Sequence, residues 1–150
     1  MAKISMELIK ELREKTQVGM MDCKKALAES DGDIEKAIEI LRKKGTAVAA
    51  KRASNETNNG CVTSVIADDY SKGALALISC ETDFSANTEH MKNFADNIAK
   101  KSIAADTSNI EKILDETLED SLSVKETLNG LIAKIGEKIA IGNVATFSTT

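Results

Sequence analysis

Several residue types that build common active sites are scarce in this sequence of 150 residues. Its one histidine, His90, has no cysteine cluster or nucleophile motif around it. There is no Gly-Lys-Ser/Thr phosphate-binding loop and no dinucleotide-binding glycine pattern. Aromatic residues make up 3% of the chain, too few for the stacking platforms that bind single-stranded nucleic acid. We therefore expect a binding protein without a cofactor, and not an enzyme.

Cysteines and long apolar runs are also few. The three cysteines, Cys23, Cys61 and Cys80, show no CxxC or metal-ligand spacing, and their odd number argues against a secreted disulfide framework. No apolar run is long enough to span a membrane, and residues 1–10 do not resemble a secretory leader. We therefore expect reduced thiols, no metal site, no membrane contact and a cytosolic location.

Charge is unevenly distributed along the chain. Residues 1–54 carry a net charge of +3, whereas residues 55–150 carry −7. A polar, turn-forming run, residues 55–60, begins the second part. This change predicts two modules: a partner-binding module over residues 1–54 and a core subdomain over residues 55–150.

Apolar residues recur at helical spacing in residues 1–54. Ser5 and Asp33 are suited to cap the first and third of three short helices, and Gly45 is suited to end the third. A basic, alanine-rich stretch over residues 46–53 indicates a linker helix. The pattern predicts a three-helix bundle.

Residues 55–150 show a mixed pattern. Residues 61–67 and 74–80 indicate a hairpin, and residues 139–147 a closing strand. A turn centred between Tyr70 and Ser71 would place Cys61 opposite Cys80, either as adjacent buried thiols or as an adventitious disulfide under oxidation.

Three further helices are predicted, around residues 91–98, 110–118 and 128–135. The fold class is therefore α+β: an N-terminal three-helix bundle followed by a small antiparallel sheet with packed helices.

The turn Val18-Gly19-Met20-Met21 lies between the first two predicted helices. Adjacent methionines point in different directions, so both cannot face one core. In one interpretation Met20 belongs to the core and Met21 is a scattered surface residue. In the other, one of them is offered to a partner, because methionine adapts well to binding surfaces.

The segment Thr82-Asp83-Phe84-Ser85 follows the second predicted strand. Either Thr82 or Asp83 can cap the next helix, with Phe84 as a core residue near its start. Alternatively, Asp83 and Phe84 project together from an exposed corner, where a rigid aromatic side chain can anchor a partner.

Three stretches together resemble the elongation factor Ts family, the guanine-nucleotide exchange factors of elongation factor Tu. The first, residues 12–27 with 32–38 and 41–45, is similar to the family's N-terminal module, which resembles a ubiquitin-associated domain. The second, residues 80–87, is similar to a Thr-Asp-Phe-Val signature, with Ser85 in place of the usual valine. The third, residues 133–139, resembles the end of a core subdomain.

The resemblance implies a mechanism in which this corner enters the nucleotide-binding domain of elongation factor Tu, disturbs its Mg²⁺ and lowers its affinity for GDP. The residues implied for Mg²⁺ displacement are Thr82, Asp83, Phe84 and Ser85. Those implied for a contact of the N-terminal module are Val18, Gly19, Met20, Met21 and Lys24. Those implied for a weaker core contact are Ile135 and Gly136.

Two other functions stay open at this point. The three-helix bundle alone would support a docking module without exchange activity. Nucleic-acid binding would rest on Lys43, Lys44, Lys51 and Arg52, but a net charge of −4 counts against it. Two forms of the chain are expected as alternatives. It is either a short form that pairs as a homodimer or the N-terminal half of a longer protein. Its expected location is a bacterial-type cytosol or an organelle of bacterial ancestry.

Overall fold

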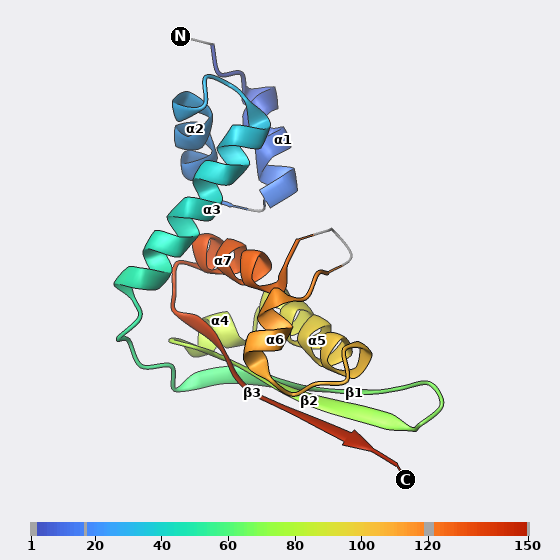
Figure 1. The fold of residues 1–150 in the computed structure, drawn as a ribbon. Helices are drawn as coiled ribbons and strands as arrows, with labels where there is room; N and C mark the ends of the chain where they lie inside the picture. Colours follow the sequence, from blue (N-terminus) through green and yellow to red (C-terminus); the bar gives the residue numbers. More distant parts are fainter. Residues whose placement is uncertain (1–2, 17, 119–121, 150) are drawn as a thin grey trace. The chain divides into compact units, whose positions relative to one another are not determined.

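The computed structural model describes residues 3–16, 18–118 and 122–149 (Figure 1). The described residues form seven helices and one three-stranded sheet, which confirms the predicted α+β fold class. The helices are α1 Met6–Thr16, α2 Met20–Glu29, α3 Ile34–Lys51, α4 Asp83–Ala86, α5 Glu89–Ala104, α6 Ile110–Asp115 and α7 Val124–Ile135. The strands are β1 Asn59–Ile66, β2 Lys72–Cys80 and β3 Ile139–Ser148. No helix in the described ranges is long and apolar enough to cross a membrane.

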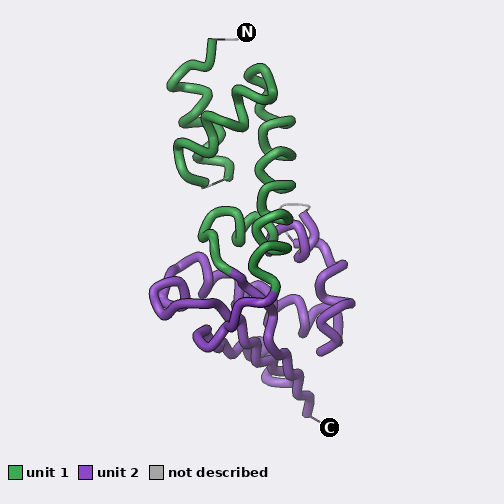
Figure 2. The backbone as a smooth tube through the Cα atoms, turned by 90° about the vertical axis from the view of Figure 1, so that its left-hand side faces the viewer, with its two compact units in different colours: residues 1–53, 129–137 green, residues 54–128, 138–150 purple. Residues whose placement is uncertain are grey.

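The chain divides into two compact units (Figure 2). The first unit comprises residues 1–53 and 129–137, and the second comprises residues 54–128 and 138–150. Each unit is therefore built from two separate stretches of sequence.

In the first unit, α1, α2 and α3 pack around a small apolar core. The core side chains are Ile9, Leu12, Val18, Cys23, Ala26, Leu27, Ala37 and Leu41. Both predicted caps are confirmed: Ser5 Oγ accepts the N–H of Leu8 at 3.2 Å, and Asp33 Oδ1 accepts that of Lys36 at 3.1 Å. The predicted three-helix bundle is present.

The prediction that the third helix ends at Gly45 is wrong, because α3 continues to Lys51. Gly45 is buried, and a Cβ atom at this position would lie 2.2 Å from the carbonyl oxygen of Asn129 in α7. The glycine therefore allows two helix backbones of the first unit to approach closely, whereas the sequence predicted that it would end a helix.

In the second unit, β2 is the central strand of an antiparallel sheet with the order β1-β2-β3. The predicted hairpin is confirmed, but its register is wrong: Cys80 pairs with Asn59, and Cys61 pairs with Ile78. The turn lies one residue earlier than expected, where Tyr70 adopts a positive φ of 59°. The two thiols are consequently not opposite each other, and all three cysteines are free.

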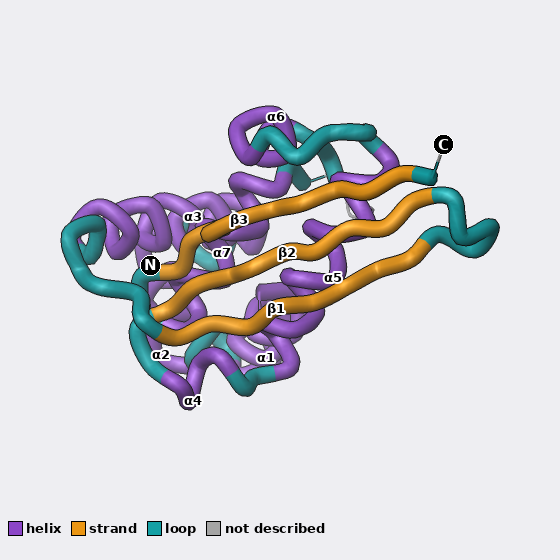
Figure 3. Tube along the Cα trace, turned by 90° about the horizontal axis from the view of Figure 1, so that it is seen from below, coloured by secondary structure: helices purple, strands orange, loops and turns teal. Residues whose placement is uncertain are grey.

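The helices of the second unit lie against one face of this sheet (Figure 3). Helix α5 contacts β1 and β2 and buries Met91, Phe94, Ala95 and Ile98, as predicted. Helix α6 is shorter than expected and leaves Leu118 outside it. The other face, here called the outer sheet face, exposes apolar side chains from all three strands: Val62, Ile66, Leu75 and Phe147.

Candidate partner-binding site

The corner predicted from the sequence lies where β2 passes into α4. Thr82 is the N-cap of this helix, and its Oγ1 accepts the backbone N–H of Ser85 at 3.3 Å. At the other end, Asn87 Nδ2 donates to the carbonyl oxygen of Asp83 at 2.9 Å. Helix α4 is therefore a single turn with side-chain hydrogen bonds at both ends.

Phe84 projects from this turn into solvent, with 84% of its surface exposed. No other large apolar side chain in the described part of the chain is more exposed. Asp83 beside it is exposed as well, whereas the side chain of Ser85 is buried. The two interpretations of the corner are thus combined: Thr82 caps the helix, but Phe84 is not a core residue.

The turn before α2 is divided between core and surface. Val18 is only 3% exposed and belongs to the core of the first unit, and its carbonyl oxygen accepts the Cys23 thiol at 3.5 Å. Gly19 is exposed and forms the N-cap position of α2. Val18, which the resemblance implied as a partner contact, therefore has its side chain in the core and not on the surface.

Both methionines of this turn are on the surface. Met20 is 45% exposed and Met21 is 66% exposed, so the interpretation that places Met20 in the core is wrong. Lys24, one turn further along α2, is also exposed. A third exposed methionine, Met6, begins α1 and was not predicted from the sequence.

The cations considered for nucleic-acid contact have structural roles in part. Lys44 Nζ forms an ion pair with the carboxylate of Asp22. Arg52 occupies the C-cap position of α3. These positions add no support for a surface that binds the phosphates of a nucleic acid.

Ile135 and Gly136 lie at the C-terminal end of α7, within the stretch that belongs to the first unit. Ile135 is half-buried. Gly136 has a φ of +78°, and its N–H donates to the carbonyl oxygen of Ile132 at 2.7 Å. The glycine therefore ends the helix in a left-handed conformation that other residues rarely adopt.

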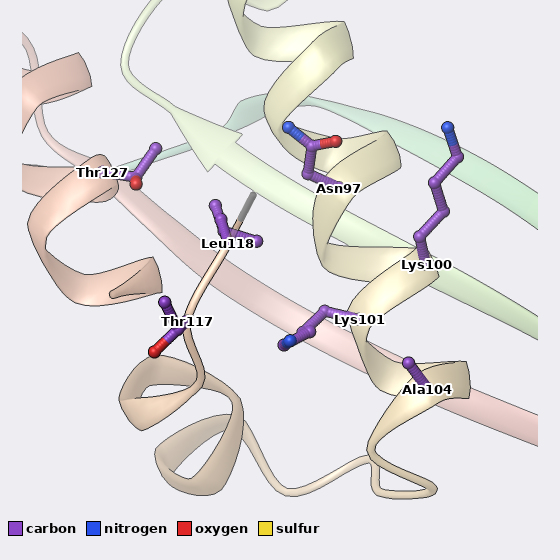
Figure 4. A pocket seen from close by; sticks show the side chains of 7 residues that line it. All are labelled: Asn97, Lys100, Lys101, Ala104, Thr117, Leu118 and Thr127. Carbon is purple, nitrogen blue, oxygen red and sulfur yellow. The ribbon is translucent and has the colours of Figure 1, made fainter. Parts of the chain in front are cut away.

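A pocket in the second unit contains none of the predicted site residues (Figure 4). It is lined by Asn97, Lys100, Lys101, Ala104, Thr117, Leu118 and Thr127. Lys101 is paired with Glu116 at 3.7 Å. This pocket could not be predicted from the sequence, because its lining comes from separate elements and contains no motif. Among the described residues, no cluster of histidine, cysteine and acidic side chains could hold a metal ion.

Comparison with known proteins gives a consistent result. Residues 81–150 match the family model described as Elongation factor TS. A relative named "Elongation factor Ts" from Clostridium botulinum is 44% identical over 145 residues, which is 97% of this chain and 48% of the relative. Proteins of the same name from Clostridium perfringens and Clostridium acetobutylicum are also 44% identical, with the same coverage.

The chain thus spans about half the length of the curated relatives it matches. The second unit supplies nearly all of the residues that match the family model, including the corner at Phe84. Identity to these relatives extends over nearly the whole chain, which confirms the predicted resemblance to the elongation factor Ts family.

Proposed function

We propose that this chain is a guanine-nucleotide exchange factor in translation elongation, which binds elongation factor Tu with its bound GDP and promotes GDP release by disturbing bound Mg²⁺. The observation that supports this best is the exposed Phe84 beside Asp83 on a single, capped helical turn. A wedge has to be accessible in the free protein, and it has to be held firmly enough to displace part of a partner.

Exchange requires coupling between two ligands of elongation factor Tu, the nucleotide and this chain. Each of them weakens the binding of the other equally. A thousandfold loss of nucleotide affinity requires about 4 kcal/mol, because each tenfold step requires about 1.4 kcal/mol. Displacement of Mg²⁺ is an effective route, because the ion is among the largest local charges beside the phosphates. No covalent bond is made or broken, so the protein is not an enzyme in the usual sense.

The proposed contacts divide into direct and supporting residues. Asp83 and Phe84 contact the partner directly, while Thr82 and the buried Ser85 hold α4 in place. In the first unit, the direct contacts are Gly19, Met20, Met21 and Lys24, and Val18 supports the turn from the core. Ile135 and Gly136 provide a weaker contact.

We also propose a cytoplasmic location, by analogy with the bacterial relatives, and the formation of a homodimer. A dimer would use the outer sheet face, because contiguous exposed apolar surface commonly marks an interface. The alternative function, a docking module without exchange, needs only the first unit and gives Phe84 no role.

The test is the release of a fluorescent GDP analogue from elongation factor Tu, with and without this chain, over a range of Mg²⁺ concentrations. Faster release that weakens as Mg²⁺ rises supports the proposal and means that these residues suffice for exchange. Binding without acceleration supports the docking module instead.

A further inference from the structure

The backbone that leads into the corner is held from the β3 side by a side chain. The last paired residues of the β2–β3 ladder are Cys80 and Ile139. One residue further on, Glu81 Oε1 accepts the backbone N–H of Lys138 at 2.7 Å. The Glu81 carboxylate therefore continues the ladder by one step, in place of a backbone acceptor.

The β1 side is held in a similar way. The β1–β2 ladder ends at the pair Asn59 and Cys80, and Asn59 Nδ2 donates to the carbonyl oxygen of Glu81 at 3.0 Å. Asn55 Nδ2 donates to the Glu81 carboxylate at 3.2 Å, and Lys138 Nζ donates to the carbonyl oxygen of Asn55 at 3.2 Å. We call these four residues the Glu81 brace: Asn55, Asn59, Glu81 and Lys138.

We propose that Glu81 is a positioning residue, which fixes the direction in which the Phe84 ring is presented to the partner. Only Thr82 separates Glu81 from α4, and Thr82 itself is fixed by its cap to Ser85. The brace therefore continues into the capped turn without a free residue between them. This inference rests on the exchange function proposed above.

The physical argument is one of preorganisation. A side chain that enters a partner has to be ordered on binding, and ordering costs free energy unless the free protein has already fixed the backbone. Hydrogen bonds to an ionised carboxylate are stronger than those between neutral groups. A loosened corner would still bind, but less of the binding energy would be available for displacing Mg²⁺.

The main variant is Glu81→Ala, compared with wild type by the release of a fluorescent GDP analogue from elongation factor Tu. We expect the saturating release rate to fall about tenfold, the effect of losing one charge-assisted hydrogen bond. The concentration for half-maximal effect should change less than about threefold, because the direct contacts remain. Glu81→Gln, which keeps an acceptor oxygen for the Lys138 N–H, should restore most of the rate.

Two further variants separate positioning from general destabilisation. Thr63→Val removes a hydrogen bond to Asp96 from the same unit, away from the corner, and should keep the wild-type rate. Asn59→Ala removes the bond on the β1 side and should lower the rate about threefold. Asn59→Ala carries the test if Glu81→Ala does not fold.

Amide hydrogen exchange reports on the brace independently of activity. In Glu81→Ala, the amides of Lys138 and Ser85 should lose protection, while the central amides of β3 keep theirs. A wild-type release rate in Glu81→Ala, or an equal loss in Thr63→Val, overturns the positioning role but leaves the exchange function intact.

If the wild-type chain itself does not accelerate release, the exchange function fails. The brace is then judged by hydrogen exchange alone, and unchanged protection of Ser85 in Glu81→Ala overturns it.

Discussion

Replacing Phe84 with alanine tests the proposed wedge with little effect on the fold. The ring is 84% exposed, so the free protein loses almost no buried apolar surface. Alanine is also a better helix former than phenylalanine within α4. We therefore expect the melting temperature of the variant to equal that of wild type.

The size of the expected effect follows from the exposed area. A buried aromatic side chain removes roughly 150–250 Å² from water. With 84% of that area free, insertion of Phe84 would bury roughly 130–210 Å², which is about 3–5 kcal/mol at about 25 cal/mol per Å². This is an upper limit, because binding also orders groups. The range of about 3–5 kcal/mol includes the roughly 4 kcal/mol that a thousandfold loss of nucleotide affinity requires.

The assay compares binding with exchange. For Phe84→Ala, affinity for the GDP-bound partner should stay within about threefold of wild type, because the other contacts remain, while acceleration of GDP release is largely lost. Tyr70→Ala is the matched control: this ring, on the β1–β2 turn, is 78% exposed, and its loss should change neither quantity. Equal losses of binding and exchange in Phe84→Ala, or unchanged release, would refute the wedge.

Three other predictions concern stability and reactivity. Gly45→Ala should destabilise the first unit, because the added Cβ would lie 2.2 Å from the carbonyl oxygen of Asn129. Gly130→Ala meets no atom within 4 Å and should stabilise by up to about 1 kcal/mol, so equal thermal shifts would contradict the close helix contact. The pKa of Asp33 is lowered, chiefly by the backbone N–H that its carboxylate accepts at the start of α3. Its stabilising effect is therefore complete above the unfolded-state pKa and is lost as the pH falls through the lower folded-state pKa. Asp33→Asn should flatten the acid side of a plot of melting temperature against pH, and an unchanged slope would argue against this role. The pKa of the Cys61 thiol is raised mainly by burial and, to a smaller extent, by a nearby carboxylate. Alkylation of Cys61 by iodoacetamide at pH 8 should consequently be slower than that of a free cysteine peptide and should increase at higher pH, whereas an equal rate would count against the burial.

The sequence predicted the parts of the fold in which a residue type, at its position, has a single common structural role. Asp33 is an example, because an aspartate before an apolar helical stripe is best used as a cap. Gly45 is the opposite case, because a glycine can end a helix or allow another backbone to approach. Only the distant residue Asn129 decides between these uses, and its position is a property of the tertiary structure.

The hairpin register was unpredictable for a related reason. It depends on Tyr70 in a left-handed conformation, which an aromatic residue rarely adopts. A shift of the turn by one residue moves every pair across the two strands, and it separated Cys61 from Cys80.

The candidate site was predictable in its residue types but not in its exposure. A threonine after a strand indicated a cap, and Thr82 is one. Whether Phe84 packs inward or projects outward depends on how α4 is oriented by its neighbours, so the sequence left both possibilities open. The same holds for Val18, whose side chain packs in the core of the first unit.

The division of the chain has a consequence for its synthesis. The first unit needs residues 129–137, which place the Asn129 carbonyl against Gly45, but residues 54–128 come between. At a synthesis rate of about 5–20 residues per second, these intervening residues take roughly 4–15 s to synthesise. During this interval the nascent helices α1 to α3 have to persist without the segment that later covers Gly45. The first unit, although its three helices are made before the second unit, is therefore completed only when most of the second unit has also been made.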